Sequence, residues 1–278
     1  MTAASMHLSP GGALPVRSPG RYRAVNATRE GIHNDEVAGA LGYRGGLVTG
    51  HAIISCVMDH AQACWPGRWT SAGSLRMWFG RPVYDGDDMY VTIEDDGAVA
   101  VTTGSADSSP RATGQVADLD QSVFTGSRRA FPASAPVPRW LTPDVAATTD
   151  ALGSTEFVVD EESYQAQLAA IGLTPPRSGV VDGTGIAYLY RYYVPHSRAN
   201  FTTDQPIIHI GAELEWQRPV AFGERISVRG RVDRAYSRRG VCYLVSDLAW
   251  CDEKEAPVLR AIHTVVYART PERVKLAV

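Results

Sequence analysis

The stretch that decides the fold is residues 29–64, REGIHNDEVAGALGYRGGLVTGHAIISCVMDHAQAC. A polar His-Asn-Asp corner at residues 33–35 leads into a short predicted helix over residues 36–41, which a glycine-rich turn ends. From Gly50 to Cys64 the apolar residues recur at helical spacing, and few of the others are strongly polar. We therefore predict a buried helix with an imidazole near its N-terminus, an arrangement suited to proton transfer beside a developing oxyanion.

Beyond this helix the apolar period changes to two, which indicates strands. We predict strands at residues 75–79, 89–93, 99–103 and 112–116, separated by turn-forming residues. Residues from about 119 to 154 are rich in Ala, Pro, Ser and Thr, a linker composition that we expect to run across a surface. Residues 1–20 read as a loose arm or an irregular first strand.

The second half of the chain repeats this plan. Arg218-Pro219-Val220 matches Arg81-Pro82-Val83 at a constant offset of 137 residues, and both copies continue into an alternating strand. An apolar helical stretch at residues 185–194 precedes the second copy, and strand patterns follow at 240–250 and 257–268. This duplication predicts an α+β fold in which each half wraps an antiparallel sheet around one helix. The expected domains are residues 1–118 and 155–278, joined by a linker at 119–154.

Composition excludes several classes of function. The 278 residues carry a formal net charge of −3, which gives no reason to expect a nucleic-acid partner. No signal peptide and no apolar stretch long enough for a membrane span is visible, so a cytoplasmic protein is expected. The four cysteines lack zinc-ligand spacing, and we expect neither a metal nor another cofactor.

The His-bearing corner, the buried helix and the duplicated Arg-Pro-Val strand together resemble the MaoC-like acyl dehydratase/hydratase branch of the hotdog fold. Two such units in one chain resemble its double-hotdog members. The resemblance covers about residues 25–270 and implies that the two sheets join into one continuous antiparallel sheet. It also implies one active site per chain, because no histidine stands in the corresponding corner of the second half. Further pairing into a homodimer is a possibility that the sequence leaves open.

In that family an Asp-x-Asn-Pro-x-His corner holds and activates water, and amides at the start of the central helix bind the thioester oxygen. On this chain the family's His falls on His33 and its helix-start Gly on Gly50. The Asp falls on Thr28, the Asn on Glu30 and the Pro on Gly31, so the usual carboxylate is missing. The resemblance makes His33 the proton-transferring group, with Glu30, Asp35 or His51 in the role of the missing Asp.

Other candidates follow from the residues themselves. Thr49 and Gly50 open the helix, whose free N–H groups suit an oxyanion, and the helix dipole should lower the pKa of His51. Arg44 could anchor a substrate carboxylate or phosphate, or pair with a neighbouring acid. Tyr188 could line a pocket or pack in the core, and Asp35 could equally cap a helix. Four further histidines, His60, His196, His209 and His263, are expected to be structural.

The leading functional prediction is a cofactor-free hydro-lyase that adds or removes water at an enoyl or 3-hydroxyacyl thioester of coenzyme A or a carrier protein. One alternative keeps the fold but recruits it to cyclisation, isomerisation or elimination in specialised metabolism. A second alternative is a binding or assembly protein that retains the pocket without turnover.

Overall fold

The computed structural model describes residues 18–269 except 27, 130 and 177, so most of the predicted N-terminal arm lies outside the described residues. In the first half, the 3-10 helix η1 (Gly31–His33) and α1 (Asp35–Ala40) precede the central helix α2 (Gly50–Cys64). The strands of this half are β1 (Gly20–Arg23), β2 (Gly73–Phe79), β3 (Asp88–Ile93), β4 (Ala98–Thr103) and β5 (Ala112–Ala117). The central helix and four strands thus lie where the sequence predicts them.

The second half contributes five long strands and several short helices. Its principal strands are β7 (Ala151–Val158), β10 (Ile208–Trp216), β12 (Arg225–Arg238), β13 (Val241–Cys251) and β14 (Pro257–Arg269). Its helices are α4 (Glu161–Ala170), η3 (Gly183–Gly185), α5 (Ile186–Tyr190) and α6 (Tyr193–Asn200), and β8 (Val180–Val181) pairs with β11 (Val220–Ala221). The single helix predicted over residues 185–194 was wrong in its extent, because the chain breaks between α5 and α6. Helix α4 and strand β7 were not predicted.

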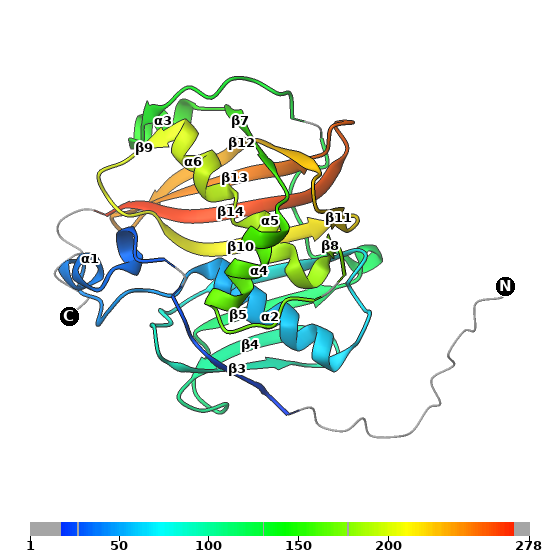
Figure 1. Ribbon diagram of the computed structural model, residues 1–278. Helices are drawn as coiled ribbons and strands as arrows, with labels where there is room; N and C mark the ends of the chain where they lie inside the picture. The colour runs from blue at the N-terminus through cyan, green and yellow to red at the C-terminus, as the bar shows by residue number, and fades with distance from the viewer. Residues whose placement is uncertain (1–17, 27, 130, 177, 270–278) are drawn as a thin grey trace.

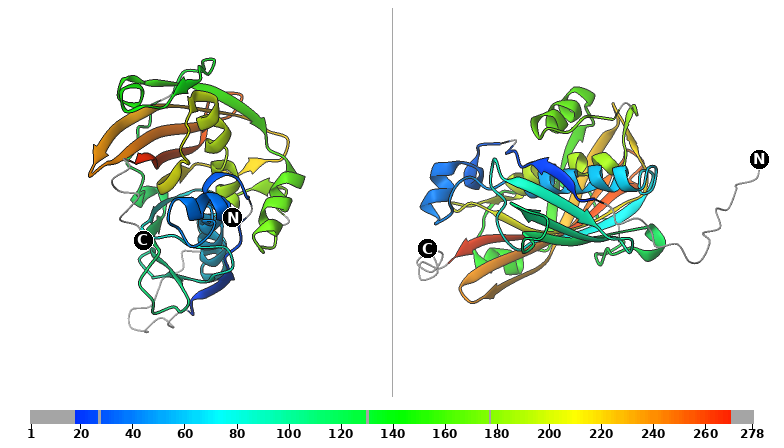
Figure 2. Two further views of the ribbon diagram at one scale, coloured as in Figure 1. Left: turned by 90° about the vertical axis from the view of Figure 1, so that its left-hand side faces the viewer. Right: turned by 90° about the horizontal axis from the view of Figure 1, so that it is seen from below.

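All ten principal strands form one antiparallel sheet in the order β1-β3-β4-β5-β2-β10-β14-β13-β12-β7. Helices α2 and α5 contact each other on one face of the sheet, which curves around them (Figures 1 and 2). This is the continuous double-hotdog architecture predicted from the sequence, and the fold class is confirmed.

The two halves meet where β2 pairs with β10. Arg76 lies directly opposite Glu213, and the two residues are 137 positions apart, which is also the offset of the sequence duplication. A local two-fold axis therefore passes between these residues. Arg76 Nε donates to Glu213 Oε1 across 3.1 Å at this point.

Residues 119–154 contain more regular structure than a linker composition suggests. They include η2 (Leu119–Gln121), β6 (Arg139–Trp140), α3 (Pro143–Thr148) and the start of β7, and β6 pairs in parallel with β9 (Phe201–Thr202). The segment also bonds to buried polar groups of the sheet. Ser122 Oγ donates to Glu215, the backbone N–H of Ser127 donates to Asp247, and Arg260 donates to the carbonyl of Arg128. These contacts supply hydrogen-bond partners to Glu215, Asp247 and Arg260, which are buried in the sheet.

The core closes where the chain beyond α2 meets the second half. Trp216 is fully buried on β10 and donates its indole N–H to the carbonyl of Trp69 at 2.8 Å. The backbone N–H of Gly183 bonds to the carbonyl of Thr70 at 2.8 Å, which brings Gly183 against the Trp216 ring. A side chain at residue 183 would overlap both the Trp69 carbonyl and the indole.

We therefore expect Gly183→Ala to lower the free energy of unfolding by about 1–3 kcal/mol or more. The added methyl group would meet the backbone carbonyl of Trp69, which cannot move aside as a flexible side chain could. Urea denaturation measures this change. Gly39→Ala is the matched control, since that glycine lies in α1 with open space around it and the substitution should raise stability by up to about 1 kcal/mol. Equal effects of the two substitutions would contradict the close packing described for Gly183 against Trp69 and Trp216.

Candidate active site

The start of α2 presents free backbone donors. Thr49 caps the helix: its side chain accepts from the N–H of Ala52, and its carbonyl accepts from Ala52 and Ile53. Within the described residues, the amides of Gly50 and His51 donate to no other group. These two N–H groups carry the positive end of a 15-residue helix and can bind an oxygen that acquires negative charge.

His33 ends η1 and is fixed by the turn that follows it. Leu47 donates its backbone N–H to the carbonyl of Ile32, and its own carbonyl lies 2.6 Å from His33 Nδ1. A carbonyl can only accept, so Nδ1 carries the hydrogen and Nε2 holds the lone pair of the neutral ring. The ring makes no other hydrogen bond to a described residue, which leaves Nε2 free. Burial lowers the pKa of His33, while Leu47 and the Glu30 carboxylate act in the opposite direction.

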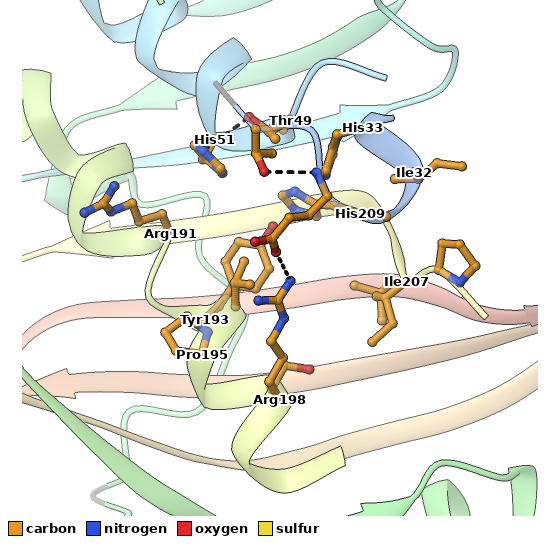
Figure 3. A pocket seen from close by; sticks show the side chains of 18 of the residues that line it. Ile32, His33, Thr49, His51, Arg191, Tyr193, Pro195, Arg198, Ile207 and His209 are labelled. Carbon is orange, nitrogen blue, oxygen red and sulfur yellow. Dashed lines mark hydrogen bonds and ion pairs between the residues drawn. The ribbon is translucent and has the colours of Figure 1, made fainter. Parts of the chain in front are cut away.

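A cavity of about 990 Å³ opens beside His33 and the start of α2. Both halves of the chain form its walls, and the side chains of His33, His51 and His209 gather on one side of it (Figure 3). Of the nine residues predicted for the site, six line this cavity: Thr28, Glu30, His33, Thr49, Gly50 and His51. Its volume suits a small molecule or the acyl end of a larger one.

His209 packs directly against the first residue of α2. Its Nε2 lies 3.0 Å from the carbonyl of Gly211, so Nε2 carries the hydrogen and Nδ1 the lone pair. A Cβ at residue 50 would overlap this Nδ1, which means that only glycine fits there while His209 is present. His209 also contacts Phe79 at a ring distance of 4.8 Å, which ties the imidazole to the β2–β10 junction.

A hydrogen-bonded cluster continues from His209 into the core. The hydroxyl of Tyr190 lies 3.0 Å from His209 Nε2 and 2.6 Å from His263 Nδ1, and the ring of Tyr193 packs 3.9 Å from that of His263. His209 and His263, which were expected to be structural, both lie on the cavity wall.

The reason that His209 was missed is a bulge in β10 between His209 and Gly211. Strict alternation from the buried Ala212 and Leu214 puts residue 209 on the outer face, but the extra residue turns its ring inward. His263 could have been found, because it alternates with the buried Ala261 and Val265 on one face of β14.

The imidazoles of this site are held neutral. Burial is the main cause in each case and lowers the pKa of His51 to about 3 and that of His209 to about 3, with His263 also well below its usual value. For His51 the charge of Arg191 and the neighbouring histidines add to the effect. The pKa of His51 is thus lowered, as the sequence predicts, with burial as the largest cause.

Glu30 is the one carboxylate among the described residues that line the cavity. It is exposed, and Arg198 binds it at 2.6 Å and lowers its pKa. Its charge nevertheless acts on His33.

Three of the residues predicted for the site lie outside the cavity. Asp35 accepts from the N–H of Gly46 at 2.7 Å, while Asn34 caps α1. Arg44 is exposed, pairs with Asp87 and lies over Tyr84. Tyr188 is buried and bonds to the backbone of Asp160. None of Asp35, Arg44 and Tyr188 lines the cavity, because each is held by a local partner outside it.

Residues 18–269, with the three gaps given above, contain no group of three or more His, Cys, Asp or Glu side chains placed to hold a metal ion. No helix within those residues is long and apolar enough to cross a membrane.

No protein-family model and no curated protein matches this sequence. Solved structures match along almost its full length. A protein assigned to the MaoC-domain dehydratases, from Chloroflexus aurantiacus, is 13% identical with a TM-score of 0.55, covering 96% of this chain and 100% of its own. A MaoC-like dehydratase is 10% identical (TM-score 0.54; 91% and 96% covered), and a protein assigned as a thioesterase, from Novosphingobium aromaticivorans, is 13% identical (0.52; 91% and 99%). The resemblance to MaoC-like hotdog proteins is thereby confirmed at the level of the fold.

The neutral histidines predict a steep dependence of stability on pH. Their pKa values lie lower in the folded than in the unfolded chain, so the unfolded state binds more protons below pH 6.5. The free energy of unfolding should therefore fall by about 1.4 kcal/mol per pH unit for each such histidine as the pH drops from 6.5 toward 4. Urea titrations at several pH values measure the slope. His209→Phe should remove the contribution of one proton, and an unchanged slope in that variant would contradict the assignment.

Proposed function

We propose that this protein is a hotdog-fold hydro-lyase that adds or removes water at an enoyl or 3-hydroxyacyl thioester. The observation that carries the proposal is the placement of one free imidazole nitrogen, Nε2 of His33, in the same cavity as the two unpartnered amides at the start of α2. A proton acceptor and an oxyanion site are the two groups that this chemistry requires.

In the dehydration direction, His33 Nε2 takes the proton from the carbon next to the thioester. The electron pair moves onto the thioester oxygen, which the amides of Gly50 and His51 stabilise. The enolate then expels the 3-hydroxyl group, and the protonated His33 returns its proton to that oxygen, so that one water leaves and the double bond remains. Hydration is the reverse sequence.

One imidazole suffices for both proton transfers in this scheme, so the missing family Asp is not required. The Nδ1–H of His33 donates to Leu47 in both protonation states and holds the ring orientation throughout. The Glu30 carboxylate favours the protonated ring. Because the charge of Glu30 is shared with Arg198, its effect on His33 is moderated rather than lost.

Isomerisation of the double bond is a second candidate. It needs the same proton shuttle and the same oxyanion site but no water. The observation that favours it is the ion pair of Glu30 with Arg198, which leaves the described cavity wall without an unpaired carboxylate to orient water.

Enoyl thioesters of several chain lengths, incubated in ¹⁸O-labelled water and separately in D₂O, distinguish the candidates. The hydro-lyase incorporates ¹⁸O at the 3-position, whereas an isomerase shifts the double bond and exchanges deuterium without taking up oxygen. Release of free thiol would instead indicate a thioesterase. Binding of the thioesters without any of these reactions would favour a non-catalytic binding protein.

His33→Gln should lower kcat by about 10²- to 10⁴-fold, because the amide cannot transfer the proton. Asp35→Asn is the control: the amide oxygen can still accept from Gly46, so kcat should change little. The comparison is made in the hydration assay with both variants checked by thermal unfolding. A large loss in Asp35→Asn with activity retained in His33→Gln would reverse the roles assigned to the two residues.

The acid limb of kcat/KM should lie below pH 6.5, since burial lowers the pKa of His33 and the neutral ring is the form that starts dehydration. Glu30→Gln removes a group that raises this pKa and should move the limb to still lower pH. The pH–rate profile of the two proteins measures both effects. A limb that moves upward in Glu30→Gln would contradict the assignment of His33 as the base.

A further inference from the structure

Arg191 occupies the short break between α5 and α6 and lines the cavity. Its guanidinium donates to the hydroxyl of Ser163 at 2.7 Å and lies over the rings of Tyr188 and Tyr192, 4.6 and 5.1 Å from their centroids. These contacts fix the direction of the guanidinium, because stacking and the hydrogen bond restrict the long side chain.

The charge of Arg191 has no counterion among the described residues: no Asp or Glu oxygen of that set lies within 4.0 Å of it. Arg198, the other arginine of the cavity wall, is paired with Glu30. The side chains of Arg191 and His51 lie on the same side of the cavity (Figure 3), and the charge of Arg191 acts on the His51 imidazole. The inner wall of the cavity therefore carries a net positive charge that the protein itself leaves uncompensated.

Gln167 provides a second, independent observation on the same wall. The residue lies on α4 one turn beyond Ser163, lines the cavity and is 5% exposed. Both its amide nitrogen and its amide oxygen are buried without a hydrogen-bond partner among the described residues. A buried amide left in this state is unfavourable, and a bound ligand that reaches it would recover part of that cost.

We propose that Arg191, Ser163 and Gln167 form a subsite for a carboxylate carried on the acyl group of the substrate. A planar guanidinium that is already oriented recognises a carboxylate through two parallel hydrogen bonds. The proximity of Arg191 to His51 favours a carboxylate on the acyl group over the distant phosphate of a thioester carrier. The structure thus assigns to Arg191 the anchoring role for which Arg44 was the sequence-based candidate. The reaction at the other end of the acyl group rests on the proposed function, but the binding preference does not.

Calorimetric binding of two saturated thioesters tests the subsite without any turnover: glutaryl-pantetheine and its terminal methyl ester. The wild-type protein should bind the free carboxylate about tenfold or more tightly, the effect expected of a hydrogen-bonded ion pair. Arg191→Gln should abolish this preference, and Arg191→Lys should retain part of it. Arg44→Gln is the matched control, an arginine that also lies over a tyrosine ring but stands outside the cavity, and should keep the full preference.

Thermal unfolding of each variant shows whether the loss of stacking has damaged the fold, and Arg191→Lys keeps the test informative if Arg191→Gln does not fold. Equal affinity of the wild type for the two thioesters, or a preference that survives in Arg191→Gln, would overturn the proposal. A third result would also overturn it: an Arg191-dependent preference for the methyl ester of glutaryl-4′-phosphopantetheine over the methyl ester of glutaryl-pantetheine. The anion that Arg191 binds would then belong to the carrier. Absence of hydration by the wild type, with the carboxylate preference intact, would count against the proposed reaction alone.

Discussion

The pairing of β2 with β10 is the interaction on which the rest of the structure depends. It joins two five-stranded halves into one sheet, and its centre, where Arg76 faces Glu213, coincides with the axis of the sequence duplication. Because α2 and α5 lie on the same face of this sheet, the start of α2 comes against residues of the second half. The cavity is therefore composite: one half supplies His33 and the free amides, and the other supplies His209, His263 and Arg191.

The two halves have the same order of helix and strands but contribute different groups to the cavity. The first has a helix start capped by Thr49 and preceded by an imidazole, which suits proton transfer and charge stabilisation. In the second, α5 is five residues long, and Gly185 before it provides no side-chain cap. Its tyrosines pack in the core or against the histidines, and the break that follows releases Arg191 into the cavity wall. The shorter helix of the second copy thus places an arginine on the wall of the cavity that the first copy also lines.

The fold could be predicted from the sequence because its signals are local and repeated: helical spacing in α2, alternation in the strands and the duplicated Arg-Pro-Val segment. The first-half contribution to the site followed from the same corner of sequence. His209 and Arg191 of the second half did not, since their placement depends on a bulge that reverses the facing of His209 and on a helix break at Arg191. Arg44 was predicted for the site because it lies next to the glycine-rich turn in sequence, but its ion pair with Asp87 holds it outside the cavity. Closeness in sequence to a site residue therefore does not place a side chain in the site when a tertiary partner binds that side chain elsewhere.

The contact between Gly50 and His209 also constrains how this site can change over generations. Gly50 cannot be exchanged while His209 is present, because any side chain at residue 50 would meet the imidazole, whereas loss of the imidazole would only leave an open space beside the helix start. Substitutions at the two positions must accumulate in a fixed order, with the ring replaced by something smaller before the glycine can be lost. Among related chains, a residue larger than glycine at this position should therefore be accompanied by a smaller residue on the facing strand.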